Sequence, residues 1–311
     1  VRIKYLGRKG RLPEIMKGLK NADPTERPAI GKQANEFKTA LQEIIDTRKS
    51  EWTGPVTTGD SATFDVTLPG QWRGRGTRHP VTLITERAVS ILRTMGFTVA
   101  EGPEIETVFN NFDALNTPAD HPSRDPQDTF YLDEENLLLR THTSPVQIRY
   151  MQEHQAPVRI VAPGRAYRRD TPDATHSATF HQIEGLYVDK KVSLANLKGD
   201  LAYFASKMMG PDVKVRFRPH FFPFTEPSVE VDFSCHMCNG QGCRVCKQSG
   251  WIEIAGAGMV DPEVFKAVGY EPEDVTGYAF GMGIERMAMI LYGIQDIRML
   301  YENDIRFLNQ V

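Results

Sequence analysis

Two stretches of sequence decide the fold of this chain: PGRAYRRD at residues 163–170 and TFHQIEG at residues 179–185, joined by a loop over residues 171–177. Both stretches alternate in character. This alternation predicts two neighbouring β-strands, because successive side chains of a strand point to opposite faces.

The face that these two strands share carries a combination of chemical groups. Arg168 on the first strand can bind a phosphate, Phe180 on the second can stack on a ring, and Gln182 and Glu184 can accept from an amino group. A dense basic segment is also commonly just a solvated strand, so these residues alone leave both interpretations open.

Helical periodicity flanks the region of strands. It precedes the strands at Val81, Ile84, Ala88, Ile91 and Leu92 and ends at Met95-Gly96, and it returns over residues 284–292. Between residues 96 and 260 we expect short strands and long loops. Strands outside a βαβ rhythm predict an antiparallel sheet flanked by helices, which is an α+β fold.

The composition of the 311 residues is that of a globular protein, with 40% hydrophobic and 25% charged residues. No apolar run reaches the roughly 18 residues that a membrane span needs, and no hydrophobic signal core opens the sequence. We therefore expect a soluble, cytoplasmic protein. The first residue is valine, and we expect the natural chain to begin upstream of it.

Charge is unevenly distributed along the chain. Residues 1–50 hold twelve Lys and Arg against six Asp and Glu, an excess of six positive charges, whereas the whole chain has a net charge of −3. A basic arm on an acidic body points to a polyanionic partner, although a solvated helical face explains the charge equally well.

Residues 1–52 are predicted to form two helices that fold back as an antiparallel hairpin. The second helix carries a coiled-coil-like seam of about two heptads, with the apolar residues Ile30, Ala34, Phe37, Leu41 and Ile44. The first helix carries the apolar set Leu12, Ile15, Met16 and Leu19. The residues DPTE (23–26) predict the start of the second helix, and Pro28 can move that start a few residues on. Residues 53–78 are rich in Gly, Thr and Pro and are predicted to be a linker, with one short alternating run at residues 63–68.

Two further segments suggest a function only in combination. The residues GMGIER (281–286) open a helix with two glycines, which permits close approach of a phosphate to the backbone, with Arg286 in the first turn. The residues MGFTVAEGPEIE (95–106) end a helix at a glycine and continue as a strand that Pro103 interrupts, which predicts an edge strand suited to a subunit contact. Taken singly, the first is also typical of a glycine turn before a core helix, and the second of an ordinary edge strand.

All four cysteines lie in the segment CHMCNGQGCRVC (235–246). Two CxxC pairs separated by four residues fit a tetrahedral zinc site with the ligands Cys235, Cys238, Cys243 and Cys246. His236 is a further candidate, but four cysteines suffice. Disulfides are not expected in a cytosolic chain, so the alternative to structural zinc is a set of redox-active or vestigial thiols.

In this order and spacing, segments 95–106, 163–185 and 281–286 resemble motifs 1, 2 and 3 of class II aminoacyl-tRNA synthetases. The residues RTHTSPVQ (140–147), FFPFTEPS (221–228) and AFGMG (279–283) resemble the α subunit of bacterial phenylalanyl-tRNA synthetases. The resemblance implies an antiparallel class II catalytic domain over residues 79–311 with a four-cysteine insert at 235–246. It also implies that residues 1–52 are a tRNA-binding arm.

The activity implied by the resemblance is ATP-dependent activation of L-phenylalanine and its transfer to tRNA(Phe). The implied ATP-binding residues are Arg168, Asp170, His176, Phe180, Glu285 and Arg286. Among them, Arg168 contacts the α-phosphate, His176 and Arg286 bind the outer phosphates, and Phe180 stacks on adenine. Attack by a carboxylate needs no general base, so catalysis depends on positioning and on charge stabilisation by arginine and Mg²⁺.

Two acidic residues, Asp170 and Glu226, have separate implications in this implied site. Asp170 stands where many class II enzymes carry Glu. Glu226 is the predicted magnesium ligand.

The implied phenylalanine-binding residues are His142, Ser144, Gln147, Gln182, Glu184, Phe222, Phe224 and Ala279. The polar members surround the ammonium and carboxylate groups, Phe222 and Phe224 meet the substrate ring edge to face, and Ala279 leaves room at the floor. Without the resemblance, core aromatics is the preferred interpretation of these two phenylalanines. An apolar pocket rejects an added hydroxyl by only about 10²-fold, so the resemblance implies editing on the β subunit.

The implied partners are a β subunit in an α2β2 heterotetramer and tRNA(Phe), with Mg²⁺ and structural Zn²⁺ as metals. Two other classes of function remain open. A catalytically silent synthetase-like protein that binds RNA or regulates should have lost site residues, whereas Arg168, Arg286, Gln182 and Glu184 are present. A nucleic-acid-binding module made of the basic arm and the cysteines leaves segments 221–228 and 281–286 unexplained.

Overall fold

The computed structural model describes residues 2–21, 23–52, 76–235 and 237–310. The chain divides into two units, residues 1–73 and residues 74–311. Most of the predicted linker lies outside the described residues, as do the alternating run at 63–68 and His236. Among the residues that the structure describes, no helix is both long enough and apolar enough to cross a membrane.

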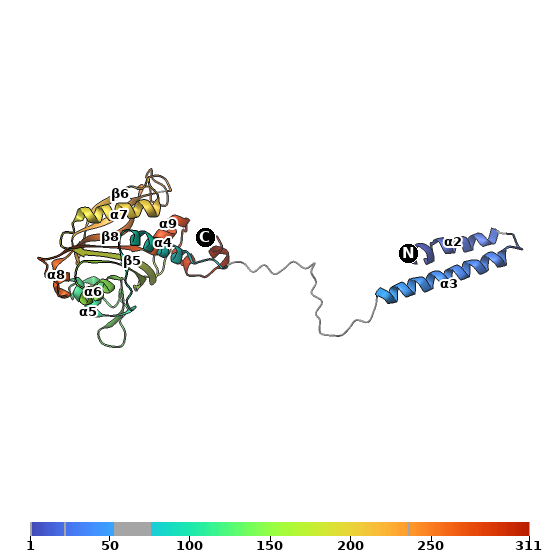
Figure 1. Cartoon of the computed structure of the whole chain (residues 1–311), viewed down its shortest axis with the longest axis horizontal. Coiled ribbons are helices and arrows are strands. Elements are labelled where there is room, and N and C mark those ends of the chain that lie inside the picture. Colours follow the sequence, from blue (N-terminus) through green and yellow to red (C-terminus); the bar gives the residue numbers. More distant parts are fainter. Residues whose placement is uncertain (1, 22, 53–75, 236, 311) are drawn as a thin grey trace. The chain divides into compact units, whose positions relative to one another are not determined.

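The first unit is helical. It contains α1 (Arg2–Leu6), α2 (Arg11–Gly18), the short 3₁₀ helix η1 (Leu19–Asn21) and α3 (Arg27–Trp52), and α2 lies beside α3 (Figure 1). α3 begins at Arg27 and not at Asp23, whose side chain accepts from the Thr25 N–H at 3.2 Å in the preceding turn. Pro28 therefore falls in the first turn of the helix, where the missing N–H has no cost.

The apolar seam expected along α3 is only partly buried. Leu12 and Ala34 are 5% and 8% exposed, but Phe37 and Ile44 are 54% and 61% exposed. α2 has eight residues and α3 has 26, so at about 1.5 Å per residue the shorter helix covers only part of the longer one. The seam prediction was therefore wrong at Phe37 and Ile44, and the coiled-coil hairpin stays a prediction.

The second unit is built on a seven-stranded sheet with the order β1-β4-β5-β9-β8-β7-β6. Its strands are β1 (Thr98–Val99), β4 (Val158–Tyr167), β5 (Thr179–Asp189), β6 (Val215–Phe222), β7 (Thr225–Ser234), β8 (Trp251–Val260) and β9 (Thr276–Gly283). Neighbouring strands run antiparallel, except that β1 is parallel to β4. A two-stranded sheet pairs β2 (Ile105–Thr107) with β3 (Leu137–Leu139). The predicted α+β fold with an antiparallel sheet is confirmed.

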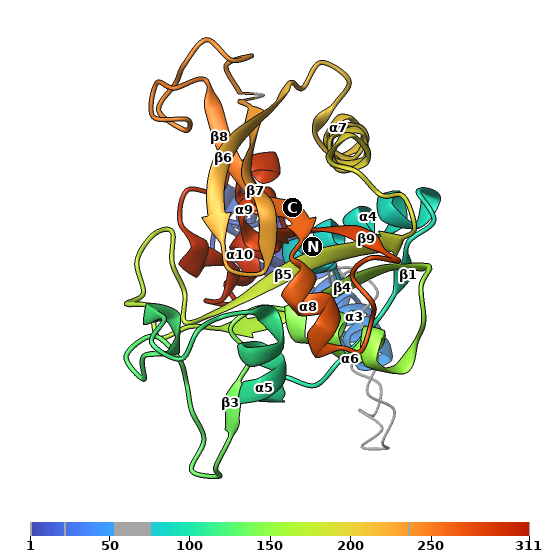
Figure 2. The ribbon, with the colours of Figure 1, turned by 90° about the vertical axis from the view of Figure 1, so that its left-hand side faces the viewer.

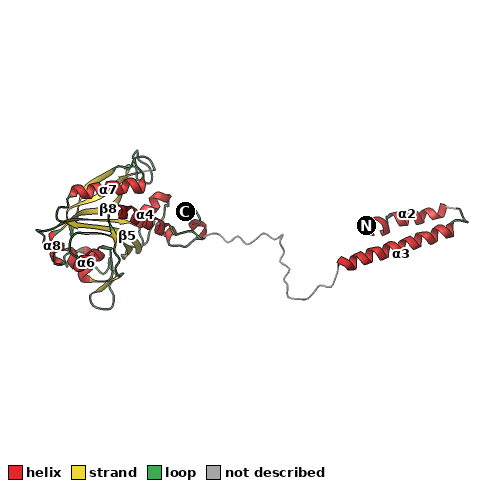
Figure 3. Ribbon diagram, viewed as in Figure 1, coloured by secondary structure: helices red, strands yellow, loops and turns green. Residues whose placement is uncertain are grey.

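Helices cover both faces of the large sheet (Figures 2 and 3). On one face lies a core cluster to which α4 (Pro80–Thr94), α7 (Leu194–Met209) and α9 (Ile284–Tyr292) contribute. On the other lies a second core cluster, to which α6 (Ser144–Glu153) and α8 (Pro262–Ala267) contribute. The remaining short helical segments are α5 (Val108–Asn111), η2 (Asp113–Leu115), η3 (Pro122–Arg124), η4 (Ile297–Leu300) and α10 (Ile305–Leu308).

The predicted helices at 81–92 and 284–292 are confirmed as α4 and α9. The expectation of short strands and long loops between residues 96 and 260 was wrong. β4, β5, β7 and β8 have ten or eleven residues each, and α6 and α7 were not predicted. α7 has a clear start, since Ser193 and Asn196 cap each other's backbone N–H groups.

The segment 95–106 has the expected form. Gly96 follows α4 with φ at +89°, a conformation that favours glycine, and β1 comes next. β1 stands at the end of the strand order, so the predicted edge strand is confirmed.

Candidate active site

The hairpin of β4 and β5 forms the floor of the site. Gly164 pairs with Gln182, Ala162 pairs with Glu184, and the Arg168 N–H donates to the Ala178 carbonyl just beyond the paired strands, at 3.0 Å. This is the strand–loop–strand that the sequence predicts.

Gly164 also makes room for a buried arginine, on the face of the hairpin that carries Gln182 and Glu184. A Cβ atom at Gly164 would lie 2.2 Å from Arg140 Nη2. The Arg140 guanidinium is buried and donates to the carbonyl oxygens of Gly102, Pro103 and Arg165, so it ties the segment 95–106 to β4.

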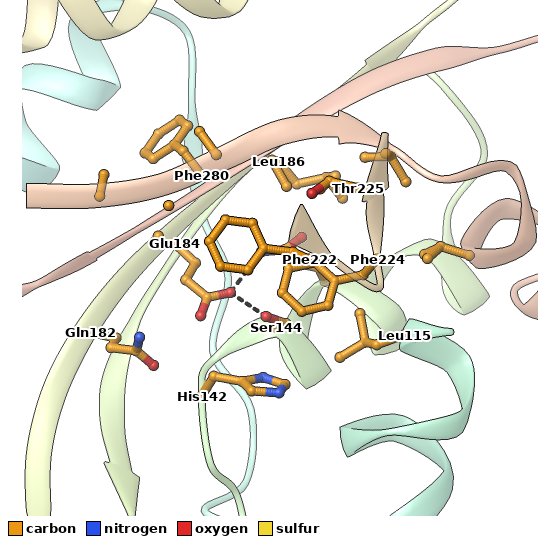
Figure 4. A pocket seen from close by; sticks show the side chains of 18 of the residues that line it. Leu115, His142, Ser144, Gln182, Glu184, Leu186, Phe222, Phe224, Thr225 and Phe280 are labelled. Atoms are coloured by element: carbon orange, nitrogen blue, oxygen red, sulfur yellow. Dashed lines mark hydrogen bonds between the residues drawn. The ribbon is translucent and has the colours of Figure 1, made fainter. Parts of the chain in front are cut away.

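A cavity of about 340 Å³, called here the main cavity, opens above this floor (Figure 4). All eight residues predicted to bind phenylalanine line it: His142, Ser144, Gln147, Gln182, Glu184, Phe222, Phe224 and Ala279. These eight residues come from four separate segments of the sequence, and only the fold brings them together. Arg168 lines the cavity too.

Glu184 lies at the polar end of the main cavity and is 5% exposed. Its Oε2 accepts from Ser144 Oγ at 2.6 Å and Gln147 Nε2 at 2.9 Å, and its Oε1 accepts from the Thr143 N–H at 3.2 Å. Burial raises the pKa of this carboxyl group, although the hydrogen bonds oppose the rise. Gly281 leaves space beside it, since a Cβ there would lie 3.1 Å from Glu184 Cγ.

Two buried polar atoms in the lining of the main cavity have no hydrogen-bond partner within the described protein: His142 Nδ1 and Gln182 Oε1. Buried polar atoms are normally paired, so this end of the cavity suits a polar ligand. Burial and the nearby positive charges of Arg168 and Arg140 lower the pKa of His142 to about 3. His142 is therefore neutral near pH 7, and it can offer a ligand hydrogen bonds but no charge.

Phe222 and Phe224 project into the main cavity from the tip of the β6–β7 hairpin (Figure 4). Their ring centroids lie 5.8 Å apart with planes 12° from parallel. Asn116 Nδ2 donates to the Pro223 carbonyl between them at 2.9 Å, which fixes the tip. The rest of this end is mainly aliphatic, with Leu115, Ile148, Met151, Leu186, Val260, Val264 and Ala279, and Thr225 lies beside Leu186. The cavity therefore has one polar end and one largely apolar end.

Arg168 stands at the border of the cavity. Its Nε donates to the Thr141 carbonyl at 3.2 Å, and its guanidinium lies 5.0 Å from the centroid of the Phe180 ring. The predicted placement of Arg168 and Phe180 on one face is present in the structure.

Arg286 lies in the first turn of α9, is exposed, and donates from Nε to the Glu253 carbonyl at 3.0 Å. Glu253 itself lines the main cavity, and so does Gly283 at the start of α9. Arg286 therefore stands beside the cavity.

The predicted role of Glu285 needs a correction. It was predicted to bind ATP, but it is 2% exposed and faces the protein. Its carboxylate accepts from the N–H and Nδ1 of His181 and from the Tyr301 hydroxyl, at 2.5 to 2.9 Å. A carboxylate with its acceptor sites used in this way holds β5, α9 and Tyr301 together, and it does not reach the cavity.

Five other predicted residues do not line the main cavity: Phe180 and Arg286, described above, and Asp170, His176 and Glu226. Asp170 and His176 are exposed in the loop after β4, where His176 Nδ1 lies 3.0 Å from Asp173 Oδ2. Glu226 is exposed and lines a second cavity together with Asp113 and Asp261. Their roles stay predictions.

Two carboxylates of the main cavity escaped sequence analysis: Glu230 on β7 and Glu253 on β8. Arg218 joins them, with Nη1 at 2.6 Å from Glu230 and Nη2 at 3.7 Å from Glu253. Carboxylate oxygens are the ligands that Mg²⁺ prefers, so these two, the cavity carboxylates other than Glu184, are groups that could hold a magnesium ion. Their only sequence signal is an alternating charge pattern along the strands.

The four cysteines converge at the end of the β7–β8 hairpin. Their sulfur atoms all lie within 4.8 Å of one another, and three Sγ–Sγ distances are 3.7, 3.8 and 3.8 Å. A tetrahedron with Zn–S distances of about 2.3 Å has sulfur–sulfur edges of about 3.8 Å, so the spacing fits zinc. All four cysteines are free of disulfides.

The backbone around the cysteines also fits a metal-bound thiolate cluster. The N–H groups of Gly242, Cys243 and Gly250 donate to cysteine sulfurs at 3.1 to 3.3 Å. Burial raises the pKa of Cys246, but the N–H groups of Cys243 and Gly250 outweigh it and hold that pKa at about 6. At Gly250 a Cβ would lie 2.3 Å from the Gly240 carbonyl oxygen, so glycine is needed where the two knuckles meet.

Comparisons with known proteins show the family of this chain. The sequence profile of the family described as tRNA synthetases class II core domain (F) matches residues 63–311, and that of the aminoacyl tRNA synthetase class II N-terminal domain matches residues 1–53. The phenylalanine–tRNA ligase alpha subunits of Citrifermentans bemidjiense and Geobacter sp. strain M21 are each 58% identical to the chain, over 100% of it and 92% of the relative. The chain belongs to the family of phenylalanine–tRNA ligase alpha subunits.

Another member of this family, from Geobacter sulfurreducens, is 54% identical to the chain over 100% of it and 91% of the relative. Among solved structures, pyrrolysyl-tRNA synthetase from Desulfitobacterium hafniense matches with a TM-score of 0.58 and 16% identity, over 96% of this chain and 95% of that one. At that identity the structural match supports the class II fold alone.

Proposed function

We propose that the chain is the catalytic α subunit of an enzyme that activates L-phenylalanine with ATP and transfers it to tRNA(Phe). The main observation is the cavity with a buried carboxylate at one end and two phenylalanine rings at the other, bordered by Arg168. An α-amino acid with an aromatic side chain has the same arrangement of charge and ring.

Each end of the amino acid meets matching groups. Glu184 accepts from the substrate ammonium, and the neutral His142 and Gln182 complete its hydrogen bonds without adding charge. Phe222 and Phe224 pack against the phenyl ring, an interaction worth about 0.5–1.5 kcal/mol beyond the buried area. The aliphatic wall leaves a tyrosine hydroxyl unpaired, a penalty that discriminates only weakly, in keeping with editing on a β subunit.

The reaction needs charge stabilisation more than proton transfer. The phenylalanine carboxylate attacks the α-phosphorus of ATP, and the bond to the pyrophosphate oxygen breaks. Arg168 stabilises the charge on the α-phosphate while Phe180 stacks on adenine, with Arg286 and His176 at the outer phosphates. Class II synthetases depend on ATP and Mg²⁺ in general. Bound Mg²⁺ neutralises phosphate charge, and Glu230 and Glu253 are the residues that would hold it.

A catalytically silent regulator is a weaker alternative, because Arg168, Gln182 and Glu184 all line one cavity. The test is phenylalanine-dependent ATP–pyrophosphate exchange by the chain co-purified with its β subunit. Exchange with phenylalanine and with no other amino acid of similar size supports the proposal. A reconstituted pair without any exchange refutes it.

The four cysteines are proposed to bind one structural zinc ion, and the near-tetrahedral sulfur spacing carries this part of the proposal. The zinc joins the ends of β7 and β8 and adds no chemistry to the reaction. Metal analysis of freshly purified protein with reduced cysteines should give one zinc per chain, and a protein without metal under those conditions excludes the site.

Residues 1–52 are proposed to bind the tRNA, since they hold an excess of positive charge over an otherwise acidic chain. The name of the related subunits implies a β subunit as partner, and an α2β2 assembly follows from the family resemblance.

A further inference from the structure

We propose that His220 is a positioning residue that holds the Phe222 ring against the main cavity, and that it acts on phenylalanine binding and not on ATP binding. The inference rests on the proposed function, because it assigns the Phe222 ring to the amino-acid substrate. His220 lies on β6, outside the lining of the cavity.

Four rings follow one another along the cavity: His142, Phe224, Phe222 and His220. Their successive centroid distances are 6.3, 5.8 and 4.7 Å. The first three rings line the cavity, and the His220 ring supports the Phe222 ring from outside at an interplanar angle of 54°. The shortest of the three contacts is therefore the one made by the residue that touches no ligand.

This contact spans an irregularity in the β6–β7 ladder. His220 pairs with Ser228, and the next pair is Phe222 with Thr225, so the register shifts between them. The regular ladder of β6 therefore ends at His220, and Phe221 beyond it is 70% exposed. On β6 itself, the ring next to Phe222 is the imidazole of His220, which lies on the other side of this register shift.

His220 is itself held in place by a carboxylate of the cavity. Its Nδ1 lies 3.1 Å from Glu230 Oε1, and the other oxygen of Glu230 accepts from Arg218 Nη1 at 2.6 Å. The His220 side chain is 43% exposed, whereas Glu230 is 18% exposed. A half-exposed imidazole gains a defined orientation from this anchor.

The backbone of β8 also contacts the Phe222 ring. A Cβ at Gly256 would lie 2.7 Å from Phe222 Cζ, so the ring lies directly on the backbone of β8. The Phe222 N–H donates to Ser228 Oγ at 3.2 Å. His220 and Gly256 thus contact the ring from β6 and from β8, and loss of the imidazole frees the ring to turn away from the cavity.

The test uses the enzyme with its β subunit and three variants. His220→Ala removes the ring, and His220→Phe restores a ring without the link to Glu230. His154→Ala is the matched control, because His154 also stacks on an aromatic ring, that of Tyr150 at 3.9 Å, and does not line the main cavity. Phenylalanine affinity is measured by calorimetry, and KM values for phenylalanine and ATP by pyrophosphate exchange.

We expect His220→Ala to raise the KM and the dissociation constant for phenylalanine about three- to tenfold, the range of one aromatic contact, with the KM for ATP unchanged. His220→Phe should return both values to within about twofold of the wild type, and His154→Ala should leave them unchanged. In the background of Phe222→Ala, the His220→Ala change should have no further effect on phenylalanine binding, since it acts through that ring.

Equal effects on both substrates, an unchanged phenylalanine affinity, no recovery with His220→Phe, or an additive effect in the double variant each overturn the inference. If the wild type is active and the His220→Ala variant binds phenylalanine equally well, the role of His220 is refuted and the proposed function is not. A wild type with no phenylalanine-dependent exchange refutes the proposed function instead.

Discussion

Replacement of Glu184 by glutamine tests the amino-acid end of the site most directly. The change keeps size and shape but removes the negative charge. It also turns one acceptor oxygen into an NH2 group. Ser144, Gln147 and the Thr143 N–H all donate to the two oxygens of Glu184, so this NH2 group faces a donor where the carboxylate accepted a hydrogen bond. Hydrogen bonds to charged groups contribute about 1.5–3 kcal/mol, so we expect the KM for phenylalanine to rise about 10- to 150-fold.

The assay is pyrophosphate exchange by the enzyme with its β subunit, with phenylalanine and ATP varied in turn. The KM for ATP should stay unchanged, because Glu184 is assigned to the ammonium group. 3-Phenylpropionate, which lacks that group, is the control ligand: its inhibition constant should change by less than about threefold in Glu184→Gln. A KM for phenylalanine close to that of the wild type, or an equal loss of affinity for the control ligand, refutes the assignment.

The same carboxylate predicts a pH dependence. Burial raises the pKa of Glu184, so this group takes up a proton at a higher pH than an exposed carboxyl does. The protonated form has lost the charge that attracts an ammonium group. The KM for phenylalanine should therefore rise as the pH falls through that pKa, and Glu184→Gln should not show this rise.

Three further perturbations have defined outcomes. The pKa of His142 is about 3 in the folded chain, so below about pH 6.5 the unfolded chain binds a proton at this residue and the folded chain does not. The free energy of unfolding should therefore fall by about 1 kcal/mol between pH 7 and 5.5. Thermal unfolding of His142→Asn should show a smaller loss over the same range. Zinc removal by a chelator should lower the melting temperature and increase hydrogen exchange at the ends of β7 and β8, whereas an unchanged exchange pattern contradicts a structural metal. Deletion of residues 1–52 should reduce tRNA charging far more than pyrophosphate exchange, and the tRNA affinity of the intact enzyme should fall steeply with salt; equal losses in both assays count against the arm.

Several features of the fold were readable from local sequence. α4 and α9 have clear apolar periodicity, and the alternation of residues 163–185 gave the β4–β5 hairpin with the correct face for Arg168 and Phe180. The CxxC spacing gave the cysteine cluster. These signals are local, because a helix, a hairpin and a metal knuckle each depend on residues close together in the chain.

Other features carried weak or misleading local signals. The lengths of β4, β5, β7 and β8 were underestimated, because buried strands interrupted by glycine and proline resemble loops. Glu285 looked like a ligand contact beside Arg286, but packing turned its side chain toward His181 and Tyr301. Successive residues of a helix point in different directions, so only the position of the neighbouring strand decides which of them faces a cavity.

The sequence by itself determined the family, the kind of sheet and eight of the residues that line the main cavity. Only the tertiary structure decided how these residues work: that His142 is buried enough to be neutral, that Glu184 already accepts from three groups, and that Glu230 and Glu253 share the cavity. It also placed His220 behind Phe222. Burial, charge and contact are properties of residues that are distant in sequence, and a linear pattern carries no record of them until the sheet has brought them together.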